Sequence, residues 1–203
     1  MGRKITIIDR DGSGYLLPYA LFRQHKTINF CLLNPEPAST RSSLVFKLPN
    51  DPSAVAAMIT FIHTNELPIP RHIAASQDSL RFLAHVLILG EEYFSELAHT
   101  AYTAIEKHLG ACASPHDLVG AIEVIYGDYF GISSDTGVKD LLVRWTAQRF
   151  DGEVVGSARY EGLFLSLALD AFRTDLRKEL KGLGRVVVDA DSDSWDGESA
   201  LDD

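Results

Sequence analysis

The sequence predicts an α+β domain followed by an all-helical extension, and three observations point to this fold class. Short β-branched or alternating runs near the N-terminus, at residues 4–8 and 44–48, predict strands. From Pro52 onward, apolar residues recur at helical spacing almost as far as Gly182. The last residues are instead dense in acidic and small polar types. With 46% hydrophobic and 23% charged residues, the 203-residue chain can bury a sizeable core before that tail begins.

A β-hairpin is predicted at the start of the chain. Residues 4–8 (KITII) are mostly β-branched, which favours a short strand. Residues 9–14 (DRDGSG) combine Asp, Gly and Ser, the residue types that form tight turns. Residues 15–17 then have the pattern of a returning strand, so we expect the two strands to pair.

A short helix, a loop and a third strand should follow the hairpin. Pro18 suits the first turn of a helix, because the amide hydrogen that proline lacks is not needed there. Leu21 and Phe22 follow at helical spacing. Residues 34–43 (NPEPASTRSS) have the composition of a loop, and apolar residues alternate over 44–48, which predicts a strand.

Pro52 opens the first of several longer helices. Asn65 is a suitable left-handed residue for the end of this helix, and Pro68 and Pro70 prevent its continuation. A single apolar stripe is formed by Val55, Met58, Ile59 and Ile62. Similar stripes over 80–88 and 97–109 predict two more helices, which would complete a first unit at residues 1–110.

A helical extension is predicted over residues 111–184, packed on the first unit. Ser114 and Pro115, followed by Asp117, form a strong helix start. Apolar residues continue at helical spacing, and Gly182 and Gly184 end the pattern. The helical stripes are Leu118, Ile122, Ile125 and Tyr129; Val138, Leu141, Leu142 and Trp145; and Tyr160, Leu163, Phe164, Leu167, Ala168 and Ala171.

The negative charge of the chain is concentrated at its end. Between Asp189 and Asp203 there are six Asp, one Glu and no Lys or Arg, so this segment carries −7 of the net −9. Such a segment buries too little apolar surface to order itself, and we expect residues 185–203 to form a disordered acidic tail. Ser192 and Ser194 lie among the acids, a composition that some kinases favour. The nearly neutral remainder argues against binding to nucleic acid.

The sequence favours a location in the cytoplasm, the nucleus or both. Its first residues lack the apolar run and small-residue cleavage site of a secretory leader. No stretch approaches the roughly 20 apolar residues of a membrane span. Two cysteines do not suggest a disulfide framework. We therefore expect no membrane partner.

No pattern of residues predicts catalysis or a metal site. Asp9, Asp11 and Ser13 match the start of a calcium loop, but Ala20 stands where that loop needs its bidentate acid. The same residues suit a hairpin turn, which is the interpretation that we favour over a calcium-responsive site. Seven histidines and two cysteines lack metal-ligand spacing, and no serine has a nucleophile-elbow context. We expect a protein without cofactor or enzymatic activity.

Three segments, in order, resemble the BTB/POZ domain family, particularly its divergent fungal members. Residues 16–30 (LLPYALFRQHKTINF) are similar to the strand-to-helix segment of that family, with Pro18 where a His is usual. Residues 56–69 (AAMITFIHTNELPI) are similar to the helix that ends in a Y-T-G motif, here His63, Thr64 and Asn65. Residues 85–101 (HVLILGEEYFSELAHTA) give the most specific match.

The resemblance implies an α+β unit with a small sheet flanked by helices, which acts by binding other proteins. Members commonly form homodimers through the first helix, and a subset binds a cullin scaffold as substrate adaptors of ubiquitin ligases. The dimer face would include Leu21, Phe22, His25 and Ile28. The cullin face would include His63, Asn65, Glu66, Leu67, Tyr93 and Phe94.

Separate expectations apply to three residues of the cullin face. Tyr93 shares the spacing of a buried stripe with Leu89 and Leu97, which favours a core position. Phe94 and Leu67 are better candidates for exposed anchors, because each lies at a helix end beside charged residues.

Two alternatives to a ligase adaptor stay open. One is an oligomerisation module of transcriptional or scaffolding complexes, without ligase activity. The other is a small-ligand-binding protein or an enzyme whose pocket the sequence does not reveal.

Overall fold

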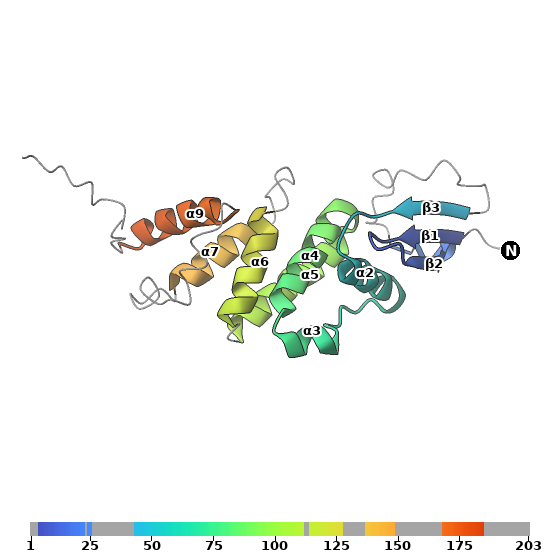
Figure 1. The fold of residues 1–203 in the computed structure, drawn as a ribbon, viewed down its shortest axis with the longest axis horizontal. Helices are drawn as coiled ribbons and strands as arrows, with labels where there is room; N and C mark the ends of the chain where they lie inside the picture. The colour runs from blue at the N-terminus through green and yellow to red at the C-terminus, as the bar shows by residue number, and fades with distance from the viewer. Residues whose placement is uncertain are drawn as a thin grey trace, which may run out of the picture.

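The computed structural model describes residues 4–22, 24–25, 43–111, 114–127, 137–148 and 168–184. Within these residues the fold is α+β, with a small mixed sheet at one end and a series of helices extending away from it (Figure 1). The predictions for Ile28, most of the loop 34–43, Tyr129, residues 160–167 and the tail 185–203 lie outside the described residues.

The sheet has three strands in the order β2-β1-β3. Strand β1 (Lys4–Ile8) pairs antiparallel with β2 (Gly14–Pro18) and parallel with β3 (Ser43–Lys47). The predicted hairpin and third strand are therefore confirmed. The side chains that face the core are Ile5, Ile7, Leu17 and Phe46, all nearly inaccessible to solvent. The central position of β1 explains its unbroken run of β-branched residues.

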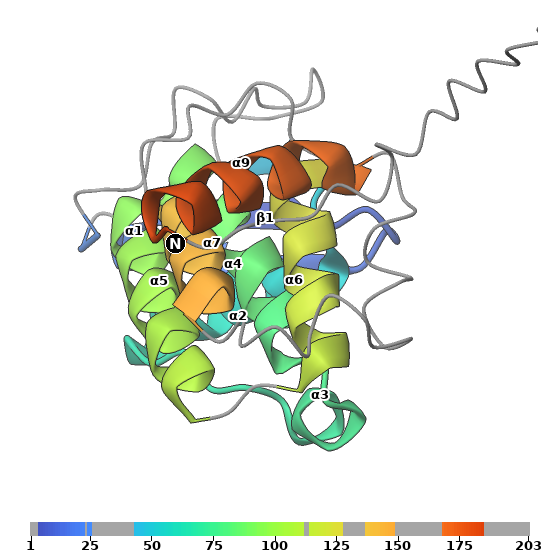
Figure 2. The ribbon, with the colours of Figure 1, turned by 90° about the vertical axis from the view of Figure 1, so that its left-hand side faces the viewer.

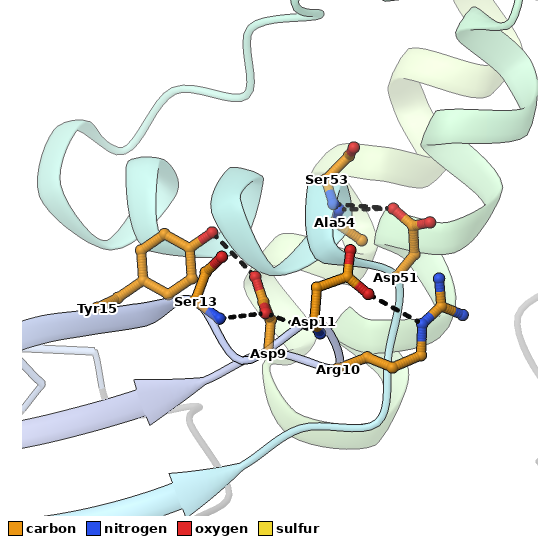
Figure 3. A network of polar contacts seen from close by, with 8 residues as sticks. All are labelled: Asp9, Arg10, Asp11, Ser13, Tyr15, Asp51, Ser53 and Ala54. Carbon is orange, nitrogen blue, oxygen red and sulfur yellow. Dashed lines mark hydrogen bonds and ion pairs between the residues drawn. The ribbon is translucent and has the colours of Figure 1, made fainter.

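The carboxylate of Asp9 organises the hairpin turn (Figure 3). Its Oδ1 accepts hydrogen bonds from the backbone N–H of Asp11 at 3.0 Å and of Ser13 at 2.8 Å. Its Oδ2 accepts a hydrogen bond from the Tyr15 hydroxyl at 3.2 Å. Burial and the bond to Asp9 both raise the pKa of Tyr15, so the hydroxyl stays a donor. The side chain of Asp9 is thus used to hold the turn.

Helix α1 (Tyr19–Phe22) is a single turn that begins one residue after Pro18, the last residue of β2. Helix α2 (Pro52–Thr64) starts where the sequence predicts it, because the Asp51 carboxylate caps it by accepting from the N–H groups of Ser53 and Ala54. Figure 3 shows this cap beside the hairpin turn. Helix α3 (Arg71–Ser76) was not predicted, and Ile73 is its one buried residue.

Helices α4 (Ser79–Tyr93) and α5 (Ser95–Gly110) form a closely packed pair at the centre of the molecule. Helix α2 packs on α4 from the side of the sheet. Gly90 permits the close approach of α4 and α5, since a Cβ at this position would lie 2.5 Å from the backbone nitrogen of Ala98. Neither helix, nor any other helix in the described ranges, is long and apolar enough to cross a membrane.

The predicted extension contains α6 (Pro115–Gly127), α7 (Val138–Gln148) and α9 (Ala168–Gly182). Helix α6 packs on α4, and α9 lies across α6 and α7 at the far end from the sheet (Figure 2). Helix α9 buries one stripe, Phe172, Leu176 and Leu180. The indole N–H of Trp145 on α7 donates to the carbonyl oxygen of Leu109 on α5 at 3.1 Å.

The acidic residue at the N-terminal end of α4 interacts with α6, and the one at the N-terminal end of α6 interacts with α4. Asp78 precedes α4 but makes no side-chain cap there, and its carboxylate lies 3.7 Å from Nε2 of His116 on α6. In turn, Asp117 of α6 accepts from the N–H groups of Leu80 at 2.6 Å and of Arg81 at 3.2 Å. The acid that caps α4 therefore comes from the extension.

Candidate functional site

The turn after α2 holds three exposed side chains in a defined geometry. Asn65 adopts the left-handed conformation, with φ 58° and ψ 23°, and its N–H donates to the carbonyl of Phe61 at 2.7 Å. Thr64 accepts from the backbone N–H of Glu66 at 3.2 Å. His63, Asn65 and Glu66 are all exposed as a result. The prediction of a left-handed end of the helix at Asn65 is confirmed.

Leu67 is partly buried against the hydrophobic core. It follows the turn directly, so its side chain lies where the chain returns to the body of the protein. The expectation of a fully exposed aliphatic anchor at this position is therefore too strong.

The junction between α4 and α5 is formed by Tyr93 and Phe94. Tyr93 is 6% exposed, as expected for a core residue, and Phe94 is 1% exposed. The expectation that Phe94 is an exposed anchor is wrong. Phe94 has an extended conformation that separates the two helices, and this conformation turns its ring inward. The ring packs edge-to-face on Phe61 of α2, with centroids 5.4 Å apart.

The resemblance assigns His25 to the dimer face, but its side chain contacts both segments of the expected cullin face. Its ring is 5.2 Å from the Phe94 ring, edge-to-face. Its Nε2 lies 3.1 Å from the carbonyl oxygen of Ile62, and its Nδ1 lies 3.5 Å from the carboxylate of Glu96. The His25 side chain is 12% exposed. His25, Phe61 and Phe94 thus form one buried aromatic hub beneath the turn after α2.

Three residues of the expected dimer face, Leu21, Phe22 and His25, lie in the described part of the chain, and each is buried or partly buried. Phe22 is 1% exposed, because α1 is a single turn that directs this ring into the core. Leu21 is partly buried against the same core, and His25 belongs to the aromatic hub. Phe22 and most of the His25 side chain therefore pack within the chain, and the dimer face stays a prediction.

The exposed side chains around the hub define the candidate site, which we call the hub surface: His63, Asn65, Glu66 and Glu96. Sequence reasoning missed Glu96, which is 46% exposed and pairs with His25. It also missed Phe61, although Phe61 lies four residues before Asn65 and is therefore one turn from the exposed segment. The sequence alone could not assign Glu96 and Phe61 to the same site, because only the folded chain brings the start of α5 close to α2.

The hub surface can bind through charge and hydrogen bonding. Two carboxylates, one imidazole and one amide face solvent around a rigid apolar base. In the described ranges, no three side chains among His, Cys, Asp and Glu gather as metal ligands would. Comparisons of the chain with family models, with curated proteins and with solved structures gave no match.

Proposed function

We propose that this chain is a BTB/POZ-like protein–protein interaction module that acts by binding and not by catalysis. The observation that carries the proposal is the contact between Phe61 and Phe94. It brings together the turn after α2 and the α4–α5 junction, the two segments that the resemblance assigns to a partner. A surface formed from separate segments on a rigid base suits recognition of a folded protein.

The order of elements supports the same proposal. A hairpin leads into a short helix, and a third strand then pairs parallel to the first. Helix α2 ends in a left-handed turn, and α4 and α5 form a closely packed pair. This is the order that the three resembling segments predict, with the short helix α3 added between α2 and α4.

The roles of the residues follow from their exposure. Glu66 and Glu96 place two carboxylates at the hub surface, and His63 adds an imidazole that can form hydrogen bonds. Phe94 acts from beneath as a positioning residue, since its ring supports α2 and does not reach solvent. We expect a partner that presents basic and polar side chains to this surface.

The more specific form of the proposal is a substrate adaptor that binds a cullin scaffold in the cytoplasm or nucleus. The alternative is an oligomerisation module of transcriptional or scaffolding complexes, without ligase activity. The adaptor binds a cullin domain, whereas the oligomerisation module binds other copies or other proteins, so one experiment can separate the two proposals.

The experiment is light scattering on a sizing column, with the chain alone and mixed with a cullin N-terminal domain. A co-eluting complex would support the adaptor. The variant Glu66→Lys should weaken the complex, because it reverses a charge on the hub surface. Glu106→Lys is the matched control, since Glu106 is also exposed but lies in the second half of α5.

Separate elution would remove the cullin proposal. An oligomer of the chain alone that Glu66→Lys disrupts would then favour the alternative. A monomer that binds no cullin domain would contradict the adaptor and the homo-oligomeric form of the alternative, and would leave only a hetero-oligomeric module.

A further inference from the structure

Strand β2 forms one edge of the sheet, and no other described strand pairs with its outer side (Figure 1). It carries Leu16, which is 59% exposed and is one of two large hydrophobic side chains exposed in the described ranges. The strand has the uncharged sequence GYLLP, whereas the opposite edge strand, β3, presents the exposed Lys47. Charged side chains on an edge strand hinder its pairing with another chain. Of the two edges, β2 is therefore the one without this protection.

The alternation of hydrogen bonds in the hairpin turns the backbone groups of Gly14 and Leu16 toward this free edge. In an antiparallel pair, every second residue bonds to the neighbouring strand, and the residues between them point their N–H and C=O groups away from it. The N–H of Asp9 donates to the carbonyl of Ser13 at 3.1 Å, in line with the register of β1 and β2. Residues 13, 15 and 17 therefore bond to β1, and Gly14 and Leu16 offer two donors and two acceptors to an added strand.

A second copy of β2 matches this edge. When two β2 strands run antiparallel about a two-fold axis at Tyr15, Gly14 of each copy lies opposite Leu16 of the other. Each of these two pairs exchanges both of its N–H···O bonds, so every outward donor and acceptor of Gly14 and Leu16 is satisfied. The Leu16 side chain then lies beside Gly14 of the other copy, where a Cβ would meet no neighbouring described atom within 4 Å. The exposed leucine therefore has open space to occupy.

The two ends of the hairpin also favour this arrangement. Pro18, the last residue of β2, lacks an N–H and would lie opposite Gly12 in the turn, so the pairing ends where β2 ends. Lys4 is exposed and lies beside Pro18 on β1. The turn at the other end, residues 9–14, holds two Asp and one Arg and carries a net charge of −1. The two-fold axis brings the Lys4 end of each copy to within about 10 Å, two strand spacings, of the acidic turn of the other. Opposite charges thus meet at both ends of the paired strands.

We propose that β2 pairs with β2 of a second copy of the chain, so that the two three-stranded sheets join into one. Tyr15, which is partly buried, adds an aromatic pair at the axis. The elements that form this contact differ from those of the hub surface, which lies on α2 and α5. Because few residues pair, the interface is small, and the dimer is weak and forms at high concentration.

The first test is sedimentation equilibrium of the full chain from about 10 µM to about 500 µM, the range in which weak dimers form. We expect the mean mass to rise toward twice that of the chain. Leu16→Lys should lower the affinity of the dimer roughly tenfold or more, because it removes the apolar contact and places two like charges on one face of the joined sheet. Leu183→Lys is the matched control, since Leu183 is the other exposed large hydrophobic residue in the described ranges. Unchanged thermal melting at low concentration would show that both variants fold.

Amide hydrogen exchange tests the pairing of the strands directly. The N–H of Leu16 points to the free edge, so its exchange should slow as the concentration rises through the same range. The N–H of Leu17 bonds to β1 and should exchange slowly at every concentration. Glu66→Lys, on the hub surface, should change neither the mean mass nor the exchange of Leu16.

Four results would overturn the proposal. One is a monomer at every concentration, and a second is a dimer that Leu16→Lys leaves intact. A third is a dimer that Glu66→Lys disrupts, which would assign self-association to the hub surface. The fourth is slow exchange of the Leu16 amide even in the dilute monomer, since the edge would then be covered within the chain. None of these results depends on whether the hub surface binds a cullin domain.

Discussion

Replacement of Asp117 by Ala should destabilise the protein more than an ordinary helix-end substitution. The Asp117 side chain is 3% exposed, caps the amides of Leu80 and Arg81 on α4, and lies 3.6 Å from Nε2 of His108. The substitution removes a cap, worth roughly 1 kcal/mol. It also leaves the buried N–H of Leu80 without its acceptor, at roughly 1–3 kcal/mol when no water replaces it, whereas the partly buried N–H of Arg81 can bond to water instead. We expect a total loss of about 2–4 kcal/mol, or a fall of roughly 6–12 °C in Tm.

The assay is urea unfolding followed by circular dichroism, with Asp140→Ala as the matched control. Asp140 is the third residue of α7, as Asp117 is of α6, but it is exposed. The control therefore removes the same helix-dipole contribution of about 0.3–1 kcal/mol without removing a long-range cap. Faster hydrogen exchange at the Leu80 and Arg81 amides would locate the effect. Equal losses for the two variants would refute the long-range cap.

The variant Asp117→Asn keeps an oxygen acceptor and isolates the effect of charge. Burial raises the pKa of Asp117, against the opposing effects of the two amide hydrogen bonds and of His108. An acid with a raised native pKa contributes stability that is present below its unfolded value of 3.8 and is lost as the pH rises through the native pKa. The stability of the wild type relative to Asp117→Asn should therefore increase as the pH falls from neutral toward 3.8. A constant or decreasing difference in the free energy of unfolding would contradict this.

Three further substitutions test the packing and turns. Gly90→Ala should lower the free energy of unfolding by roughly 1–3 kcal/mol, because the new Cβ would meet the backbone of Ala98. Gly110→Ala is the control, since a Cβ there has open space and should not destabilise the protein. Equal Tm values for the two variants would refute the close approach of α4 and α5. Asn65→Gly should preserve Tm, and Asn65→Val should lower the stability by about 1–3 kcal/mol, since φ is +58° there; two equal losses would argue against the left-handed turn. Trp145→Phe removes the hydrogen bond to α5, so the free energy of unfolding in urea should fall by about 0.5–1.5 kcal/mol. An unchanged midpoint would show that this bond does not stabilise the protein.

Elements with local causes could be predicted from the sequence. The turn that follows β1 depends on Asp9, which bonds to amides two and four residues ahead. The end of α2 depends on Asn65 and the start of α6 on Ser114, which accepts from the N–H of Asp117 at 3.1 Å. In each case the residues that interact are close neighbours in the chain, so their spacing carries the information.

Elements with long-range causes could not be predicted. Phe94 resembles an exposed helix end in the sequence, and only the position of Phe61 on α2 makes it a core residue. Asp117 resembles an ordinary first-turn acid, and nothing local indicates that it caps a helix 37 residues earlier. Helix α3 was missed because a single buried residue, Ile73, gives no periodic stripe.

Helix α4 connects the cap formed by Asp117 to the aromatic hub. Asp117 caps the first turn of α4, and Phe94 follows its last residue, so the cap and the aromatic hub lie about 20 Å apart along one helix. A rigid helix fixes both ends, but each end has its own contacts. We therefore expect Asp117→Ala to lower stability and leave the complex with a cullin domain intact at a temperature where the variant is folded. Glu66→Lys should do the reverse. Loss of the complex in folded Asp117→Ala would instead mean that the extension contributes to the partner surface.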